Sequence, residues 1–279
     1  MRRDSLIETL RLAVADFIKF GYDNQERLDY WMRRLRETID GALMPERELR
    51  AKLTRELSDV FDRTTKRERL FRKHKGLSEF TLQNLKPVLR KELDKRILAS
   101  ANLIRLNRDA SIQRTLQRFS GWATSIPTGG SNVATYRAMD PKLKRAFASL
   151  PFEERRVIID QGHKLVSSVN QIVAEDGGAI AGVWNSHYHQ AGYNYRQDHK
   201  EFDQASHKRP LVVRNNWAIR DGLMKDKGPF TDQIVQTGEE PFCRCYYTYL
   251  YSLRDLPREM LTKKGMEKLM ASNQLRKAA

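Results

Sequence analysis

The segment Glu240-Pro-Phe-Cys-Arg-Cys-Tyr-Tyr-Thr-Tyr-Leu-Tyr251 holds both cysteines of this 279-residue chain, Cys243 and Cys245. Its second half is rich in aromatic residues and predicts a strand, since such side chains favour the pleated, half-buried surface of a sheet. Two earlier segments, at 179–184 and 211–213, are apolar and predict two more short strands. This part of the chain is therefore expected to be α+β, with short strands and long loops.

The first half of the chain has a helical pattern instead. Apolar residues recur there at steps of three and four, which predicts amphipathic helices. The stripes run from Leu6 to Ile18, Leu28 to Leu43, Leu49 to Phe61 and Leu82 to Phe119. Pro87 is expected to kink a helix or to mark its start. The predicted fold class is α+β, with a mainly helical N-terminal half and a small α+β C-terminal domain.

Breaks in these patterns suggest domain boundaries. Residues 1–120 form a basic helical region, either a packing arm or a bundle. Residues 121–150 form a loop and connector, because 125–132 is rich in Gly, Pro, Ser and Asn. A short helix is expected from Pro141 to Leu150 and a longer one from Pro151. The α+β domain spans 151–258, and 259–279 is a basic C-terminal tail.

The chain is strongly basic, with a net charge of +16 and a pI near 9.9. Such an excess favours polyanions, nucleic acid first. One dense cluster could neutralise phosphates without reading bases: Arg63, Lys66, Arg67, Arg69, Arg72, Lys73 and Lys75. The alternative is a solvated charged helix that pairs with an acidic protein. No signature of a base-reading module accompanies the cluster.

No stretch of the sequence reaches the roughly 18 apolar residues that span a bilayer, and Asp4 and Glu8 interrupt any signal-peptide pattern. We therefore expect the chain to be made and kept in a reducing, cytosol-like place. A bond between Cys243 and Cys245 would close a strained small ring. Free thiols or metal ligands are the expected states of this pair.

A metal site is one use for the two thiols. Together with His199 and His207 they would supply a Cys2His2 set, which zinc accepts. The spacing is unusual, because most structural zinc sites use Cys-x2–4-Cys. We expect both thiols to reach one ion only if the segment forms a turn or bulge, which Pro241 permits. The alternative is one cysteine packed in the core and the other exposed, so we expect no cofactor other than, at most, a structural zinc ion.

Enzymatic use of the same residues is a further alternative. A cysteine, a histidine and Asp203 could serve a thiol enzyme or a metal-dependent hydrolase or transferase. No oxyanion-hole or cysteine-enzyme signature accompanies them. The carboxylates of Glu239 and Glu240 diverge in an extended chain and make no acid/base pair. The chain is therefore expected not to be an enzyme, and no catalytic residue is assigned.

Residues 152–256 contain a series of elements in a distinctive order: a helix over 160–175, a Gly turn, a strand ending at Trp184, then Arg196-x-x-His199-x-x-Phe202-Asp203 and a closing Pro241-Phe-Cys-Arg-Cys245. In this order they resemble the C-terminal domain of the Mu F-like minor head proteins of tailed bacteriophages, also called phage head morphogenesis proteins. The family has Arg-x-x-His-x-x-Leu-Asp-Gly and Pro-x-Cys-Arg-Cys. Phe202 and Gln204 depart from the first of these, so it is matched only in part.

The resemblance implies a minor structural protein of the virion, at the portal vertex or in the head interior, that aids head morphogenesis and DNA packaging or delivery. It would be made in the host cytoplasm. Its partners would be the portal protein, other head or ejection proteins and packaged double-stranded DNA, with multiple copies in a particle. The charge and the helical stripes agree with such a role. A nonspecific nucleic-acid-binding protein is the first alternative, and a metal-dependent hydrolase or transferase is the second.

Overall fold

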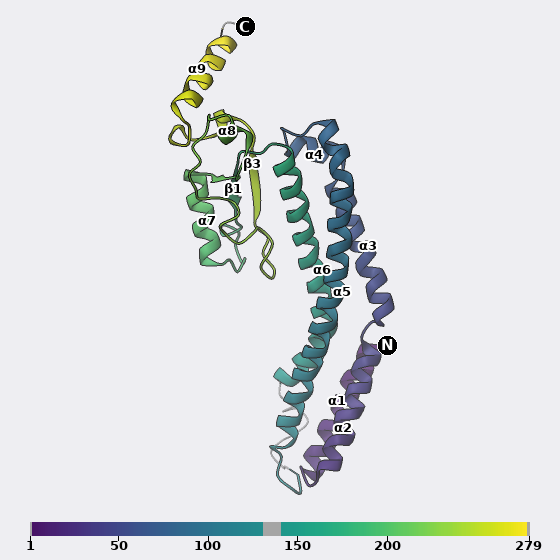
Figure 1. Ribbon diagram of the computed structural model, residues 1–279. Helices are drawn as coiled ribbons and strands as arrows, with labels where there is room; N and C mark the ends of the chain where they lie inside the picture. The colour runs from purple at the N-terminus through teal and green to yellow at the C-terminus, as the bar shows by residue number, and fades with distance from the viewer. Residues whose placement is uncertain (1, 131–140, 278–279) are drawn as a thin grey trace. The chain divides into compact units, whose positions relative to one another are not determined.

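The structure is a computed structural model and describes residues 2–130 and 141–277 (Figure 1). The chain divides into two compact units. Unit 1 comprises Met1–Arg55 and Ile97–Ile159, and unit 2 comprises Glu56–Arg96 and Asp160–Ala279. Each unit thus combines segments that are distant in sequence, and three long helices contribute residues to both.

Unit 1 is helical. It contains α1 (Arg2–Phe20), α2 (Gln25–Ala42) and parts of α3 (Glu46–Thr64), α5 (Glu79–Ala123) and α6 (Pro141–Asp176). The apolar stripes predicted for the first two helices face one core, which includes the fully buried Leu10, Phe17, Leu35 and Phe119. Asn24 caps α2, because its side chain accepts the N–H of Arg27 at 2.8 Å.

Unit 2 contains the sheet. Strands β1 (Ala181–Asn185), β2 (Leu211–Val212) and β3 (Tyr246–Leu250) form an antiparallel sheet in the order β2-β1-β3. The unit also contains α4 (Arg67–Lys73), α7 (Gln197–Lys208), α8 (Trp217–Arg220) and α9 (Lys263–Lys277), with short 3-10 turns η2 (Leu253–Asp255) and η3 (Arg258–Met260). The predicted fold class is therefore confirmed, as are the three predicted strands.

Helix α7 packs on the central strand of this sheet. Ser206 fixes it there, because its hydroxyl accepts the N–H of Trp184 at 2.9 Å and donates to the carbonyl of the same residue at 3.2 Å. Strand β2 covers only Ala181 and Gly182 of β1, so Ser206 satisfies backbone groups of β1 beyond the end of β2. The N-terminal turn of α7 is thereby held beside the segment that enters β3.

The structure excludes one of the two alternatives predicted for Pro87, the helix start, and corrects the prediction for Pro151. Helix α5 already begins at Glu79, so Pro87 lies inside it and does not start it. Helix α6 runs unbroken from Pro141 to Asp176, where a short helix and a second one from Pro151 were expected. A proline removes one N–H donor from a helix, and in helices of 45 and 36 residues the remaining hydrogen bonds maintain the structure. Of the predicted connector, 131–140 lies outside the described residues.

Candidate metal centre

The candidate site forms where the start of α7 meets the segment that leads into β3. His199 lies in the first turn of α7, whereas Cys243 and Cys245 immediately precede β3. The antiparallel pairing of β1 with β3 sets Trp184 opposite Tyr247, two residues after the second cysteine. Sheet register and helix packing together bring the three side chains into one place.

The three side chains are arranged as ligands of one ion. Nδ1 of His199 lies 3.7 Å from Sγ of Cys243 and 3.3 Å from Sγ of Cys245. Zinc binds sulfur at about 2.3 Å and nitrogen at about 2.05 Å, so tetrahedral angles predict a separation of about 3.5 Å between the two kinds of ligand. All three residues are buried. The donor set and its spacing therefore fit zinc.

The two thiols differ in acidity. The hydrogen bond from Cys245 lowers the pKa of Cys243 to about 6, against the opposing effect of burial. The same bond, together with burial, raises the pKa of Cys245. The lowered pKa of Cys243 favours its thiolate, the form that binds a metal.

The other nitrogen of the imidazole faces a carboxylate. Nε2 of His199 lies 3.4 Å from Oε2 of Glu240, and Nε of Arg196 lies 2.6 Å from the same oxygen. Arg196 also donates to the carbonyl of Pro241 at 3.0 Å. A proton on Nε2 suits this carboxylate and leaves the lone pair of Nδ1 for a metal, the arrangement usual for zinc-bound histidines.

Aromatic rings enclose the imidazole. Trp184 meets the His199 ring at a centroid distance of 5.3 Å, and Phe202 meets it at 6.4 Å. Such a wall keeps water away and fixes the ring orientation. Phe202 is the residue that replaces leucine in the partly matched sequence element, and it serves here as part of the wall.

A turn precedes the cysteines, as expected from Pro241, but it is not what brings the thiols together. Phe242 adopts a positive φ of 62°, and its N–H is accepted by the buried carboxylate of Asp160 on α6. From Cys243 onward, buried and exposed residues alternate. Residues two apart on an extended chain face the same side. The expectation that a turn or bulge is required for convergence was therefore wrong.

His207 does not join the group. It lies eight residues after His199 on α7, about 12 Å along the helix axis, and its Nε2 is 3.6 Å from Oδ1 of Asp203. The side chain is more than half exposed. Among residues 2–130 and 141–277, no fourth histidine, cysteine or carboxylate completes the His199–Cys243–Cys245 set.

The sequence did not single out the residues around the group. Glu240 was considered only as half of an acid/base pair with Glu239, and Asp160 only as the start of a helix. Both hold backbone or side-chain groups of the site in place. Glu240 could have been found from its position inside the closing sequence element, three residues before Cys243.

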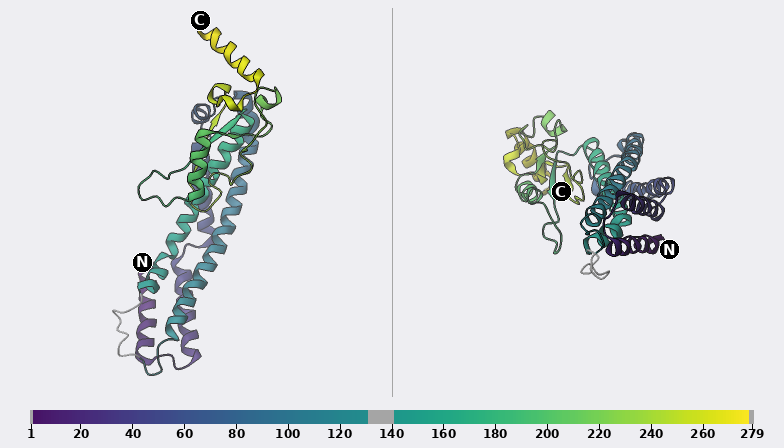
Figure 2. Two further views of the ribbon diagram at one scale, coloured as in Figure 1. Left: turned by 90° about the vertical axis from the view of Figure 1, so that its left-hand side faces the viewer. Right: turned by 90° about the horizontal axis from the view of Figure 1, so that it is seen from below.

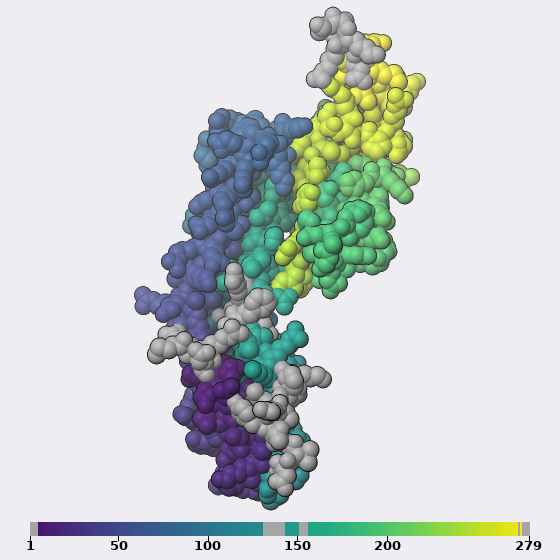
Figure 3. All heavy atoms as spheres, turned by 180° about the vertical axis from the view of Figure 1, so that it is seen from behind, coloured from purple at the N-terminus to yellow at the C-terminus, as the bar shows by residue number. Residues whose placement is uncertain are grey.

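The basic cluster of 63–75 covers the end of α3, all of α4 and the residues that follow it (Figure 3). All seven cationic side chains are exposed, whereas Leu70 is buried beneath them. Arg67 pairs with Glu79 at 3.0 Å and lies over the ring of Phe71 at 5.4 Å. The cluster is thus an accessible cationic surface of unit 2.

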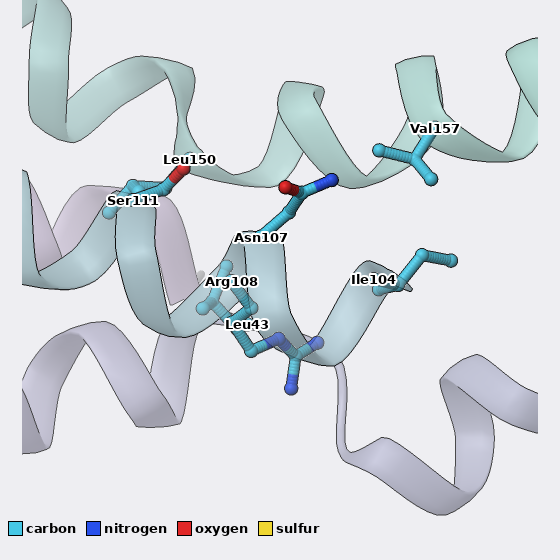
Figure 4. Close-up of a pocket in the computed structure, with 7 residues that line it drawn as sticks. All are labelled: Leu43, Ile104, Asn107, Arg108, Ser111, Leu150 and Val157. Carbon is cyan, nitrogen blue, oxygen red and sulfur yellow. The ribbon is translucent and has the colours of Figure 1, made fainter. Parts of the chain in front are cut away.

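Unit 1 contains hollows of two sizes. The one in Figure 4 has a volume of about 20 Å³, room for a single water, and is lined by Leu43, Ile104, Asn107, Arg108, Ser111, Leu150 and Val157. Another, of about 410 Å³, lies among α2, α3 and α5. Its lining includes three acidic and three arginine side chains, so its charge is balanced and selects no ligand class.

No described helix is both long and apolar enough to cross a membrane.

Comparison with protein-family models, with curated proteins and with solved structures finds no match to this chain. The resemblance to the Mu F-like proteins therefore stays a prediction.

Proposed function

We propose that this protein is a minor structural protein of a bacteriophage head, at the portal vertex or in the head interior, that aids head morphogenesis and DNA packaging or delivery. One observation carries the proposal. The Arg196-x-x-His199 element and the Cys243-Arg244-Cys245 element, which suggested the family, meet at a single buried site. Two short sequence matches that lie more than 40 residues apart therefore contribute side chains to the same site.

The rest of the molecule supports a role in assembly. The helices of unit 1 offer long surfaces for portal protein, for other head or ejection proteins or for further copies of the chain. The net charge of +16 suits a position beside packaged double-stranded DNA.

The direct test is mass spectrometry of purified particles of the phage that encodes the chain. We expect a few copies per particle, far fewer than of the major capsid protein, and cross-links to the portal protein. Particles that lack the protein would refute the proposal, as would a stoichiometry equal to that of the major capsid protein.

The proposal includes a structural zinc ion held by His199, Cys243 and Cys245. Such an ion would tie the start of α7 to the segment before β3 and so stabilise unit 2. Metal analysis of the purified full chain should find one zinc per molecule. Cys243→Ser should lose it, whereas His207→Ala, which removes a histidine outside the group, should retain it. Zinc-free wild-type protein, or equal loss in both variants, would contradict this assignment.

The basic cluster is proposed to face DNA. Neutralising Arg69, Arg72 and Lys75 should weaken binding of a 20-base-pair duplex. The slope of log K against log salt concentration should become shallower by up to about 0.9 for each phosphate that the variant no longer neutralises. The matched control neutralises three exposed basic residues elsewhere: Arg33, Arg47 and Lys91. Equal effects of the two triple variants would show that net charge, not this surface, governs binding.

A further inference from the structure

The loop between β1 and α7 is unusually aromatic. Residues 186–196 read Ser-His-Tyr-His-Gln-Ala-Gly-Tyr-Asn-Tyr-Arg and contain no aspartate or glutamate. The loop projects from the rest of unit 2 (Figure 2). The candidate metal centre uses only its last residue, Arg196, so the rings need a separate explanation.

One group of rings surrounds a lysine. Tyr188 and Tyr195 lie with ring centroids 6.2 Å apart, and Nζ of Lys200 sits 5.5 Å from the first ring and 5.8 Å from the second. His189 lies against Tyr188 at 3.7 Å, and Tyr195 remains 40% exposed. The group therefore presents aromatic surface beside a cation at the edge of the molecule.

A second group lies where the loop meets β3. The ring of His187 is 5.8 Å from that of Tyr193 and 6.1 Å from that of Tyr246, which is 45% exposed. Arg244 is also exposed, on the outward side of the segment whose cysteines point inward.

We propose that this aromatic and cationic surface, formed by loop 186–196 with Lys200, Arg244 and Tyr246, binds single-stranded nucleic acid. Base rings stack on exposed aromatic side chains whatever their sequence, and cations beside the rings neutralise the phosphates. A duplex keeps its bases stacked on one another and cannot use the rings in this way. The inference does not depend on the proposed role in a phage head and is distinct from the duplex-binding surface at 63–75.

Charge favours this partner over an acidic protein. An acidic peptide would be recognised by cations alone, and here the cations alternate with aromatic rings. Three carboxylates around the loop have partners: Asp203 accepts the N–H of Ser186, Glu240 lies against Arg196, and Asp160 lies 3.4 Å from Lys164. The loop therefore offers both of the chemistries that an unpaired strand requires.

The test is fluorescence anisotropy of the full chain with a labelled 20-nucleotide oligothymidylate and with a duplex of equal length. The double variant Tyr188→Ala/Tyr195→Ala should weaken binding of the single strand about tenfold or more, the usual effect of losing a stacking ring, and leave duplex binding within twofold. Tyr246→Ala should act in the same direction.

The matched control is Tyr30→Ala, because Tyr30 is 47% exposed but lies on α2 in unit 1. It should bind the single strand as the wild type does. Circular dichroism establishes that each variant is folded. The proposal is overturned if the double variant binds as tightly as Tyr30→Ala, or if single-strand and duplex binding fall together. Wild-type protein that prefers an acidic polypeptide such as polyglutamate to the oligothymidylate would also overturn it.

Discussion

A buried histidine in unit 2 makes the stability of this protein depend on pH. His74 has no exposed surface and joins two elements. Its Nδ1 is 2.7 Å from the hydroxyl of Tyr251, and its Nε2 is 3.0 Å from Oδ1 of Asn170. The amide nitrogen of Asn170 donates to the carbonyl of Val166, which leaves Oδ1 to accept from the imidazole. The neutral ring is therefore satisfied at both nitrogens.

The magnitude follows from the shift in acidity. Burial lowers the pKa of His74 from 6.5 to about 4, opposed only in part by the hydrogen bond to Asn170. A group with a lowered folded-state pKa contributes stability above its unfolded pKa, and that contribution is lost as the pH falls from about 6.5 towards 4. Between pH 8 and pH 5 the loss is about 2 kcal/mol, because each unit of pKa difference is worth about 1.4 kcal/mol.

The informative variant is His74→Gln, whose amide can keep partners on both sides but does not titrate. Urea denaturation followed by circular dichroism gives the free energy of unfolding at pH 8 and at pH 5. The wild type should lose about 2 kcal/mol more than His74→Gln over this range, since all other titrating groups are common to both proteins. His189→Gln, at an exposed histidine, should follow the wild type. Parallel losses in the wild type and in His74→Gln would refute the reasoning.

Three further predictions concern packing, the backbone and the metal. Phe17→Ala should cost about 3–5 kcal/mol in urea denaturation, because Phe17 is fully buried against Phe119 at 5.9 Å, whereas Phe20→Ala, at a position 42% exposed, should cost less than half of that. Gly21→Ala should lower the free energy of unfolding by more than about 2 kcal/mol, because φ is +75° and a Cβ would meet the carbonyl oxygen of Pro127. The control Gly41→Ala, in an open part of α2, should raise it by about 0.5–1 kcal/mol. Glu240→Gln should weaken zinc binding about 10- to 100-fold, measured in competition with a chromophoric chelator. Glu239→Gln, next to it in the sequence, should have no such effect. Equal zinc affinities of the two variants would count against the role of Glu240 beside His199.

Local patterns predicted the kinds of elements but not their lengths. The three- and four-residue spacing identified the buried faces of α1 and α2, and β-prone residues located all three strands. Pro151 was expected to start a helix and Pro87 to start or kink one, yet α5 and α6 continue through both. A proline destabilises one turn of a helix, whereas the packing energy of a long helix is the sum over many turns. The local signal is therefore outweighed where tertiary contacts are extensive.

The same distinction applies to the site. The sequence offered His199 and the two cysteines because their residue types suit a metal, but it offered His207 on equal terms. Only the packing of α7 on β1, fixed through Ser206, decides which histidine faces the thiols. Glu240 could not be ranked without the structure, because a carboxylate in a sequence carries no information about the imidazole that it will meet.

The residues around His199 connect several elements of unit 2. His199 and both cysteines are buried beside Trp184 and Phe202. The surrounding contacts involve the same segment: Arg196 lies against Glu240, the Glu240 carboxylate faces Nε2 of His199 at 3.4 Å, and Asp160 accepts the N–H of Phe242. Each links an element of unit 2 to the chain that enters β3. Contacts that join α6, α7 and the segment before β3 in this way support a small sheet whose second strand is only two residues long.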